Sequence, residues 1–113
     1  MLQLGYFEVY CIVENRFYLD AGGVYGIVPR AIWSRLQQAD ENNLLPFDTN
    51  VFLLRRGAHN ILFDVGLGDY LLDRQKKLYG CHAPSNLVTG LAQLGLMPAD
   101  IDYVLLSHLH WDH

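Results

Sequence analysis

Cationic side chains are scarce in this sequence, and so are cysteines and long apolar runs. The 113 residues carry 8 Lys and Arg against 12 Asp and Glu, a formal net charge of -4. That balance argues against a surface that reads nucleic-acid phosphates. Glu8, Glu14 and Arg16 interrupt the N-terminal apolar stretch, so no run reaches the roughly 18 residues of a membrane span. The same stretch lacks the basic segment and cleavage site of a secretory signal, so we expect a cytoplasmic protein with no membrane partner.

The only two cysteines, Cys11 and Cys81, lie 70 positions apart and form no CxxC pattern. A disulfide framework is therefore not indicated, and we expect both thiols to be buried or reduced. Hydrophobic residues make up 51% of the chain and charged residues only 18%, which excludes a disordered protein and indicates apolar surface that awaits a partner. A chain of this length is expected to form one domain with one core.

Stretches of β-forming residues alternate with turn signals and with amphipathic segments along the chain. The expected strands are 4–13, 17–19, 49–56, 60–65 and 103–106, the last of them buried. Residues 14–16 are expected to form a turn, 21–23 a break and 40–46 a polar loop. The strands 49–56 and 60–65 are predicted to form a hairpin that turns at Gly57. The expected helices begin near Pro29, cover 69–79, and run from an N-cap at Ser85 to a stop at Gly95.

The last six residues contain three of the five histidines, in the pattern His108-x-His110-x-Asp112-His113. In an extended segment His108, His110 and Asp112 project to the same side, and neighbouring imidazoles can share one ion at about 2.0–2.1 Å per bond. His113 joins such a site only if the backbone turns after His110, which places the motif in a loop at the end of a strand. The alternative interpretation is a chance cluster of surface histidines or the remnant of an expression tag, although Trp111 and Asp112 are not typical of a tag.

This set of donors suits a transition metal. Zinc is the expected ion, with iron, manganese or cobalt as alternatives, whereas calcium and magnesium are disfavoured. The carboxylate and the last imidazole could hold a second ion about 3.5–4 Å from the first. His59 and His82 have no partners at ligand spacing and are expected to be solvated loop residues.

Ser107-His108-Leu109-His110-Trp111-Asp112-His113 resembles the HxHxDH signature of the metallo-β-lactamase-fold hydrolases. Three earlier segments strengthen the resemblance. Residues 61–68, Ile-Leu-Phe-Asp-Val-Gly-Leu-Gly, are similar to the Asp-x-Gly motif of the family, and residues 100–106 are similar to the strand that leads into the signature. Within the family, residues 20–29 most resemble the corresponding segment of the lactonases and organophosphate hydrolases.

The resemblance implies an α+β fold, in which residues 1–113 are a single partial domain: the N-terminal half of an αββα sandwich, with a mostly antiparallel, mixed sheet and flanking helices. It implies two divalent metal ions, the first held by His108 and His110 and the second by Asp112 and His113. A metal-bound hydroxide, oriented by Asp112 as the catalytic residue, would attack an ester, lactone or related carbonyl, or a phosphotriester. Asp64 would brace the ligand loop, and its alternative role is an ordinary carboxylate at a strand end. No other cofactor is implied.

The four ligands are fewer than a two-metal site needs, and in the family the others lie downstream. We therefore expect these residues to be an N-terminal portion whose apolar sheet face is covered by the missing C-terminal half or by self-association. The small-molecule substrate is not specified by the sequence. The alternative hypothesis is a non-catalytic association module, or an inactive truncated remnant of such a hydrolase.

Overall fold

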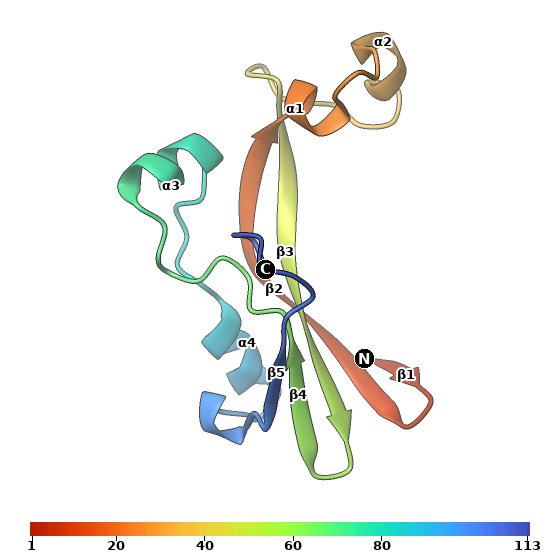
Figure 1. The fold of residues 1–113 in the computed structure, drawn as a ribbon, viewed down its shortest axis with the longest axis vertical. Coiled ribbons are helices and arrows are strands. Elements are labelled where there is room, and N and C mark those ends of the chain that lie inside the picture. The colour runs from red at the N-terminus through yellow and green to blue at the C-terminus, as the bar shows by residue number, and fades with distance from the viewer.

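A long antiparallel ladder between two strands runs the length of the molecule. In the computed structural model, which describes residues 1–113, β2 (Phe7–Asp20) pairs with β3 (Leu44–Arg56) from Glu8 opposite Arg55 to Asp20 opposite Leu44 (Figure 1). Three shorter strands complete a sheet of order β1-β2-β3-β4-β5: β1 (Leu2–Leu4), β4 (His59–Phe63) and β5 (Tyr103–Leu105). Only the pair β4 and β5 is parallel. The expected α+β class with a mostly antiparallel, mixed sheet is confirmed.

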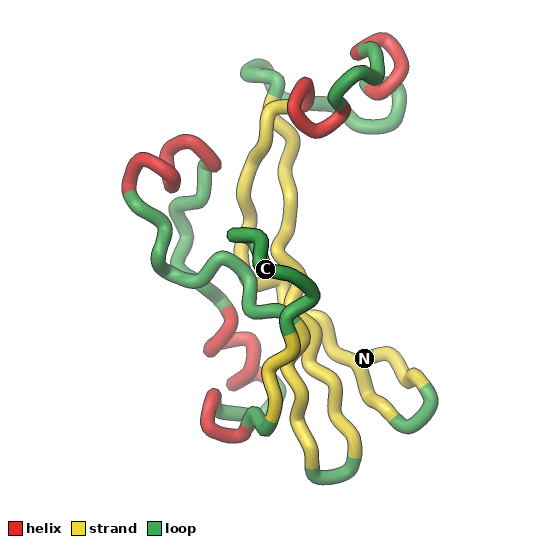
Figure 2. Tube along the Cα trace, in the orientation of Figure 1, coloured by secondary structure: helices red, strands yellow, loops and turns green.

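Short helices cap the ladder at one end and flank the sheet along its length. They are α1 (Ala21–Tyr25), α2 (Arg30–Trp33), α3 (Asp73–Tyr79), α4 (Leu87–Gln93) and the 3-10 turn η1 (Pro98–Asp100). Figure 1 shows α1 and α2 together at the tip of the ladder, whereas α4 lies beside the lower part of the sheet. Figure 2 shows that long loops connect α3 to the rest of the chain and that the C-terminal loop lies near the middle of the ladder. None of these helices has the length and apolarity needed to cross a bilayer.

The buried apolar side chains form three separate clusters, so the expectation of a single core is wrong. The largest cluster joins Ile12, Val51, Leu53 and Leu62 of the sheet to Leu91 and Leu96. A second cluster surrounds Phe17 and a third surrounds Trp33, whose ring stacks on Tyr25 at a centroid distance of 4.9 Å. The radius of gyration is 16.5 Å, larger than the value of about 13 Å for a compact domain of this length. The elongated ladder is the reason, because its ends lie too far apart to share one core.

One face of the sheet lacks a covering layer, and we call it the open face. Cross-strand partners share a face, so the register separates the two sets of side chains. The face toward α4 carries Ile12, Val51, Leu53 and Leu62, all buried. The open face is apolar and partly exposed, and its members are Val9, Cys11, Phe52, Leu54, Ile61, Phe63 and Leu105.

The expected turn at residues 14–16 is wrong, because β2 continues through it. A β-bulge between Val13 and Asn15 absorbs the irregular pattern, and the chain turns instead at Gly5, which adopts a positive φ of 58°. The expected loop at 40–46 is also wrong in part, because β3 begins at Leu44. Pro46 is tolerated there because β4 ends at Phe63 and leaves this length of β3 without a partner on that side.

The hairpin of β3 and β4 is confirmed, with Gly57 at a φ of 58° in its turn. The strand expected at 103–106 is present as β5, but its side chains are exposed rather than buried, because β5 is the last strand of the sheet. Where a break was expected at 21–23, Asp20 caps α1 by accepting hydrogen bonds from the amides of Gly22 and Gly23.

The helices expected over 69–79 and from Ser85 to Gly95 are present, with shifted ends. The helix expected over 69–79 begins only at Asp73, and α4 begins at Leu87, whose amide lies 3.4 Å from Ser85 Oγ.

Both cysteines are free. Cys81 is buried, and this burial raises the pKa of its thiol, whereas Cys11 is exposed on the open face.

Gly90 allows α4 to lie directly on β2, because a Cβ at this position would overlap Ile12 Cγ2. We expect Gly90→Ala to lower the free energy of unfolding by about 1–2 kcal/mol, since the overlap outweighs the gain of about 1 kcal/mol in helix propensity. Urea unfolding measures this change. The exposed neighbour Thr89 provides the control, and Thr89→Ala should stay within about 0.5 kcal/mol of the wild type. Equal stability of the two variants would contradict the packing described here.

Candidate metal centre

The histidine motif forms a loop that follows β5 and turns back toward the sheet. The turn after His110 is present, because the amide of His113 donates to the carbonyl of His110 at 3.2 Å. The carbonyl of His113 in turn accepts hydrogen bonds from the amides of Val65 and Gly66 at 2.8 and 3.1 Å. The loop after β4 therefore holds the end of the motif by its backbone.

The four predicted ligand residues lie together. His108 Nε2 is 3.0 Å from His110 Nδ1, and the rings of His108 and His113 have centroids 4.1 Å apart. His113 Nε2 lies 3.7 Å from Asp112 Oδ2. Neighbouring members of the motif are thus in pairwise contact within one loop.

Asp64, the residue predicted to brace the loop, contacts the motif at two points. Its carboxylate accepts hydrogen bonds from the amide and hydroxyl of Ser107 at 2.7 and 2.9 Å, and its Oδ2 lies 2.9 Å from His113 Nδ1. Asp64 is buried and adopts a left-handed φ of 62°, which aspartate tolerates better than most residues. Its burial alone would raise the pKa of the carboxyl. The hydrogen bonds from Ser107 and His113 outweigh burial and hold that pKa below its usual value, so the group is an anion that orients His113.

Trp111 packs the loop against the rest of the molecule. Its ring stacks on Tyr79 at a centroid distance of 4.3 Å and meets Phe17 edge-on at 5.1 Å. These ring contacts give Trp111 a role in packing the histidine loop.

A cavity of about 270 Å³ adjoins the motif on the side of the unpaired edge of β3. Asp64, Asp112 and His113 line one side of it, and Phe47 and Phe52 line another. The arrangement brings polar groups and apolar rings to the same hollow, as sites for small organic molecules commonly do.

The donor set fits a divalent transition metal in its chemistry. Two nitrogens on one tetrahedral ion lie about 3.3 Å apart, close to the 3.0 Å between His108 Nε2 and His110 Nδ1. Within these 113 residues no three ligand-type side chains converge on one point. The residues that would hold metal are His108, His110, Asp112 and His113, and their ligand roles stay predictions. His59 and His82 are exposed, and the only acid near His59 is Asp102, at 3.9 Å.

Neither Ser107 nor Glu14 was predicted to support the metal centre. Ser107 Oγ lies 2.9 Å from His108 Nδ1 as well as from Asp64, so it connects the bracing carboxylate to the motif. Its position directly before His108 is the signal that could have indicated this. Glu14 is fully buried beneath the loop after β4, and its signal was an acidic residue inside an apolar β run.

The five-stranded mixed sheet and the histidine loop that follows β5 can be compared with known proteins. Residues 44–113, more than half of the chain, match the family model of the Metallo-beta-lactamase superfamily. The chain belongs to this superfamily.

Solved structures with the same architecture are larger. A probable metal-dependent hydrolase from Staphylococcus aureus is 31% identical with a TM-score of 0.92, and the match covers 99% of this chain and 41% of that one. AidC, a dizinc quorum-quenching lactonase, is 21% identical with a TM-score of 0.72, and AbOPH, a hydrolase in the beta lactamase superfamily, is 22% identical with a TM-score of 0.75. Each of these two matches covers 99% of this chain and 36% of the other. This chain therefore spans 36–41% of the length of these proteins. A search of curated protein sequences gave no match.

Proposed function

We propose that this chain is the ligand-bearing, N-terminal part of a metal-dependent hydrolase that acts on an ester, a lactone or a related carbonyl compound, or on a phosphotriester. The observation that carries the proposal is the gathering of His108, His110, Asp112 and His113 in one loop that Asp64 anchors. Membership of the superfamily supports hydrolysis as the reaction class. The dizinc lactonase among the structural neighbours supports a lactone as one of these substrates.

Two divalent ions, zinc in the first place, are the proposed cofactors. When bound, they would supply Lewis-acid polarisation of the substrate and of a water molecule. Asp112 lines the cavity, where its carboxylate would accept a hydrogen bond from the attacking water and orient it. His113 is oriented by Asp64 and His108 is contacted by Ser107, so both rings are restrained before any ligand arrives.

The open face is the proposed contact surface for further protein. It exposes apolar side chains on three central strands, and an uncovered sheet face of this kind is stable only when another layer packs on it. The remaining part of the hydrolase is the occupant we propose in a complete molecule, and a second copy is the occupant when the chain is alone. This face also favours the second candidate function, an association module without catalysis.

Zinc analysis together with turnover tests the proposal. We expect the chain, alone or with its completing part, to bind zinc, and His110→Ala to weaken the affinity more than a hundred-fold, because it removes one of the nitrogens that would share an ion. Turnover of a panel of lactones, esters and phosphotriesters should fall with it. His59→Ala removes an exposed imidazole outside the motif and should change neither quantity.

A zinc-free chain with unchanged self-association would refute the hydrolase proposal and leave the association module. Zinc binding that both histidine variants weaken equally would also refute it, because the ion would then not depend on the motif.

A further inference from the structure

A buried carboxylate that the proposed chemistry does not use lies beneath the loop that follows β4. Glu14 is 1% exposed. Its Oε2 accepts hydrogen bonds from the Leu67 amide and the Thr49 hydroxyl, both at 2.9 Å, and its Oε1 accepts one from the Gly68 amide at 3.2 Å. Three donors and no cationic partner surround this group, so hydrogen bonds alone hold its two oxygens in place.

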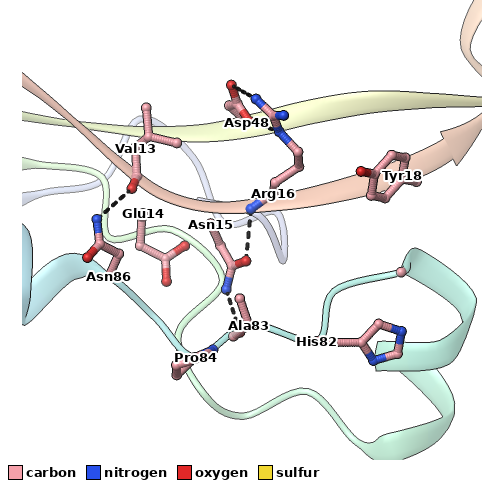
Figure 3. Close-up of a pocket in the computed structure, with 11 residues that line it drawn as sticks. Val13, Glu14, Asn15, Arg16, Tyr18, Asp48, His82, Ala83, Pro84 and Asn86 are labelled. Carbon is pink, nitrogen blue, oxygen red and sulfur yellow. Dashed lines mark hydrogen bonds and ion pairs between the residues drawn. The ribbon is translucent and has the colours of Figure 1, made fainter.

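The β-bulge in β2 directs Glu14 toward that loop. The register shift between Val13 and Asn15 places the side chains of Glu14 and Asn15 on the same side of the strand, away from those of Val13 and Arg16 (Figure 3). Asn86 fixes the bulge, because its amide donates to the carbonyl of Glu14 at 2.9 Å and its side chain donates to that of Val13 at 3.2 Å. The carboxylate is thus held in one direction before it meets the loop.

The loop lies directly against the carboxylate. Gly66 adopts a φ of 78°, and a Cβ at this position would overlap the Glu14 carboxylate. The amides of Val65 and Gly66, on the other side of the same loop, donate to the carbonyl of His113 at 2.8 and 3.1 Å. The segment 65–68 therefore receives its support from Glu14 and, through its own amides, holds His113, the last residue of the motif.

We propose that Glu14 is a positioning residue for His113, acting through the loop 65–68. Asp64 orients the ring of His113, whereas the loop fixes its backbone, and that backbone position depends on a carboxylate more than 90 positions earlier in the chain. The consequence for metal affinity rests on the proposed function. The expected loosening of the loop 65–68 is independent of the proposed function.

Glu14→Gln is the test variant, because glutamine has the same shape but offers only one acceptor oxygen. If the glutamine oxygen takes the place of Oε2, it still accepts from the Leu67 amide and the Thr49 hydroxyl. The side-chain NH2 group then faces the Gly68 amide, so two hydrogen-bond donors oppose each other. We expect amide hydrogen exchange at Val65, Gly66 and Gly68 to accelerate at least ten-fold relative to the core amides of Leu53 and Leu62. We also expect the dissociation constant for zinc to rise about ten-fold or more.

Leu91→Ala is the control for a general loss of stability. Leu91 is buried in α4 against β2, outside the loop 65–68, so its truncation should accelerate core and loop amides together and leave zinc affinity unchanged. If Glu14→Gln fails to fold, Thr49→Val removes one of the three donors to Glu14 and should give the same selective acceleration at about three-fold.

An unchanged ratio of loop to core exchange in both Glu14→Gln and Thr49→Val would overturn the proposal. A selective loop effect with unaltered zinc affinity would overturn it too, because the loop would then not position His113 for metal. A wild-type chain that takes up no zinc would refute the proposed function instead, and the exchange ratio alone would then decide whether Glu14 holds the loop.

Discussion

Replacing Asp64 with alanine is expected to lower the free energy of unfolding by about 3–5 kcal/mol. The buried carboxylate accepts two hydrogen bonds from Ser107 and contacts His113 Nδ1, and hydrogen bonds to a charged group contribute about 1.5–3 kcal/mol each. Alanine at a left-handed φ of 62° adds about 1–2 kcal/mol of backbone strain. Urea unfolding followed by circular dichroism measures the sum, which is smaller than the parts because the partners share one group.

Asp64→Asn separates the two causes. Asparagine tolerates the left-handed backbone and keeps one oxygen for Ser107, so we expect it to lose only about 1–2 kcal/mol. If the alanine variant matched the wild type within 1 kcal/mol, Asp64 would be the ordinary strand-end carboxylate of the alternative interpretation. The motif loop would then depend on its other contacts.

Introducing a charge in the middle of the open face is expected to weaken self-association of the isolated chain at least a hundred-fold. Phe52 is 38% exposed and lies between Cys11 and Phe63 on neighbouring strands. Phe52→Lys removes about 2–3 kcal/mol of apolar burial from an interface and places an ammonium group there. Every 1.4 kcal/mol is about ten-fold in the dissociation constant, so a monomer of 12.9 kDa should predominate in sedimentation at concentrations where the wild type is expected to self-associate.

Val24→Lys is the matched control, because Val24 is 39% exposed but lies in α1 at the far tip of the ladder. It should sediment as the wild type does. Assemblies that survive Phe52→Lys, or that Val24→Lys disrupts equally, would show that a surface other than the open face joins the copies.

Local patterns predicted those parts of the fold whose residues are close in sequence. The β3 and β4 hairpin needs only alternating β-formers around Gly57, and α4 needs only its apolar spacing before Gly95. The continuous β2 strand was missed because Glu14, Asn15 and Arg16 are typical of a turn. What keeps them extended is Thr49, which accepts from the Asn15 amide, and Asn86, which binds Val13. Such partners lie 34 and 73 positions away, where local propensity carries no information.

The candidate site divides in the same way. Alternation along a strand and a turn after His110 are local patterns, and they singled out the four side chains of the histidine loop. The part played by Asp64 came from the resemblance rather than from the residues alone, since its contacts with Ser107 and His113 span 43 and 49 positions. Glu14 had only one local signal, its acidic side chain within an apolar β run. Its partners Leu67 and Gly68 are 53 and 54 positions away, and a single buried acid in a β run names no partner.

The two tryptophans give the molecule separate optical reporters. The indole of Trp111 lies between Tyr79 and Phe17, so its emission follows the order of the histidine loop. Trp33 is enclosed with Tyr25 at the opposite tip and follows the end of the ladder instead. With one indole changed to phenylalanine at a time, fluorescence distinguishes loosening of the loop from unfolding of the sheet in a single titration.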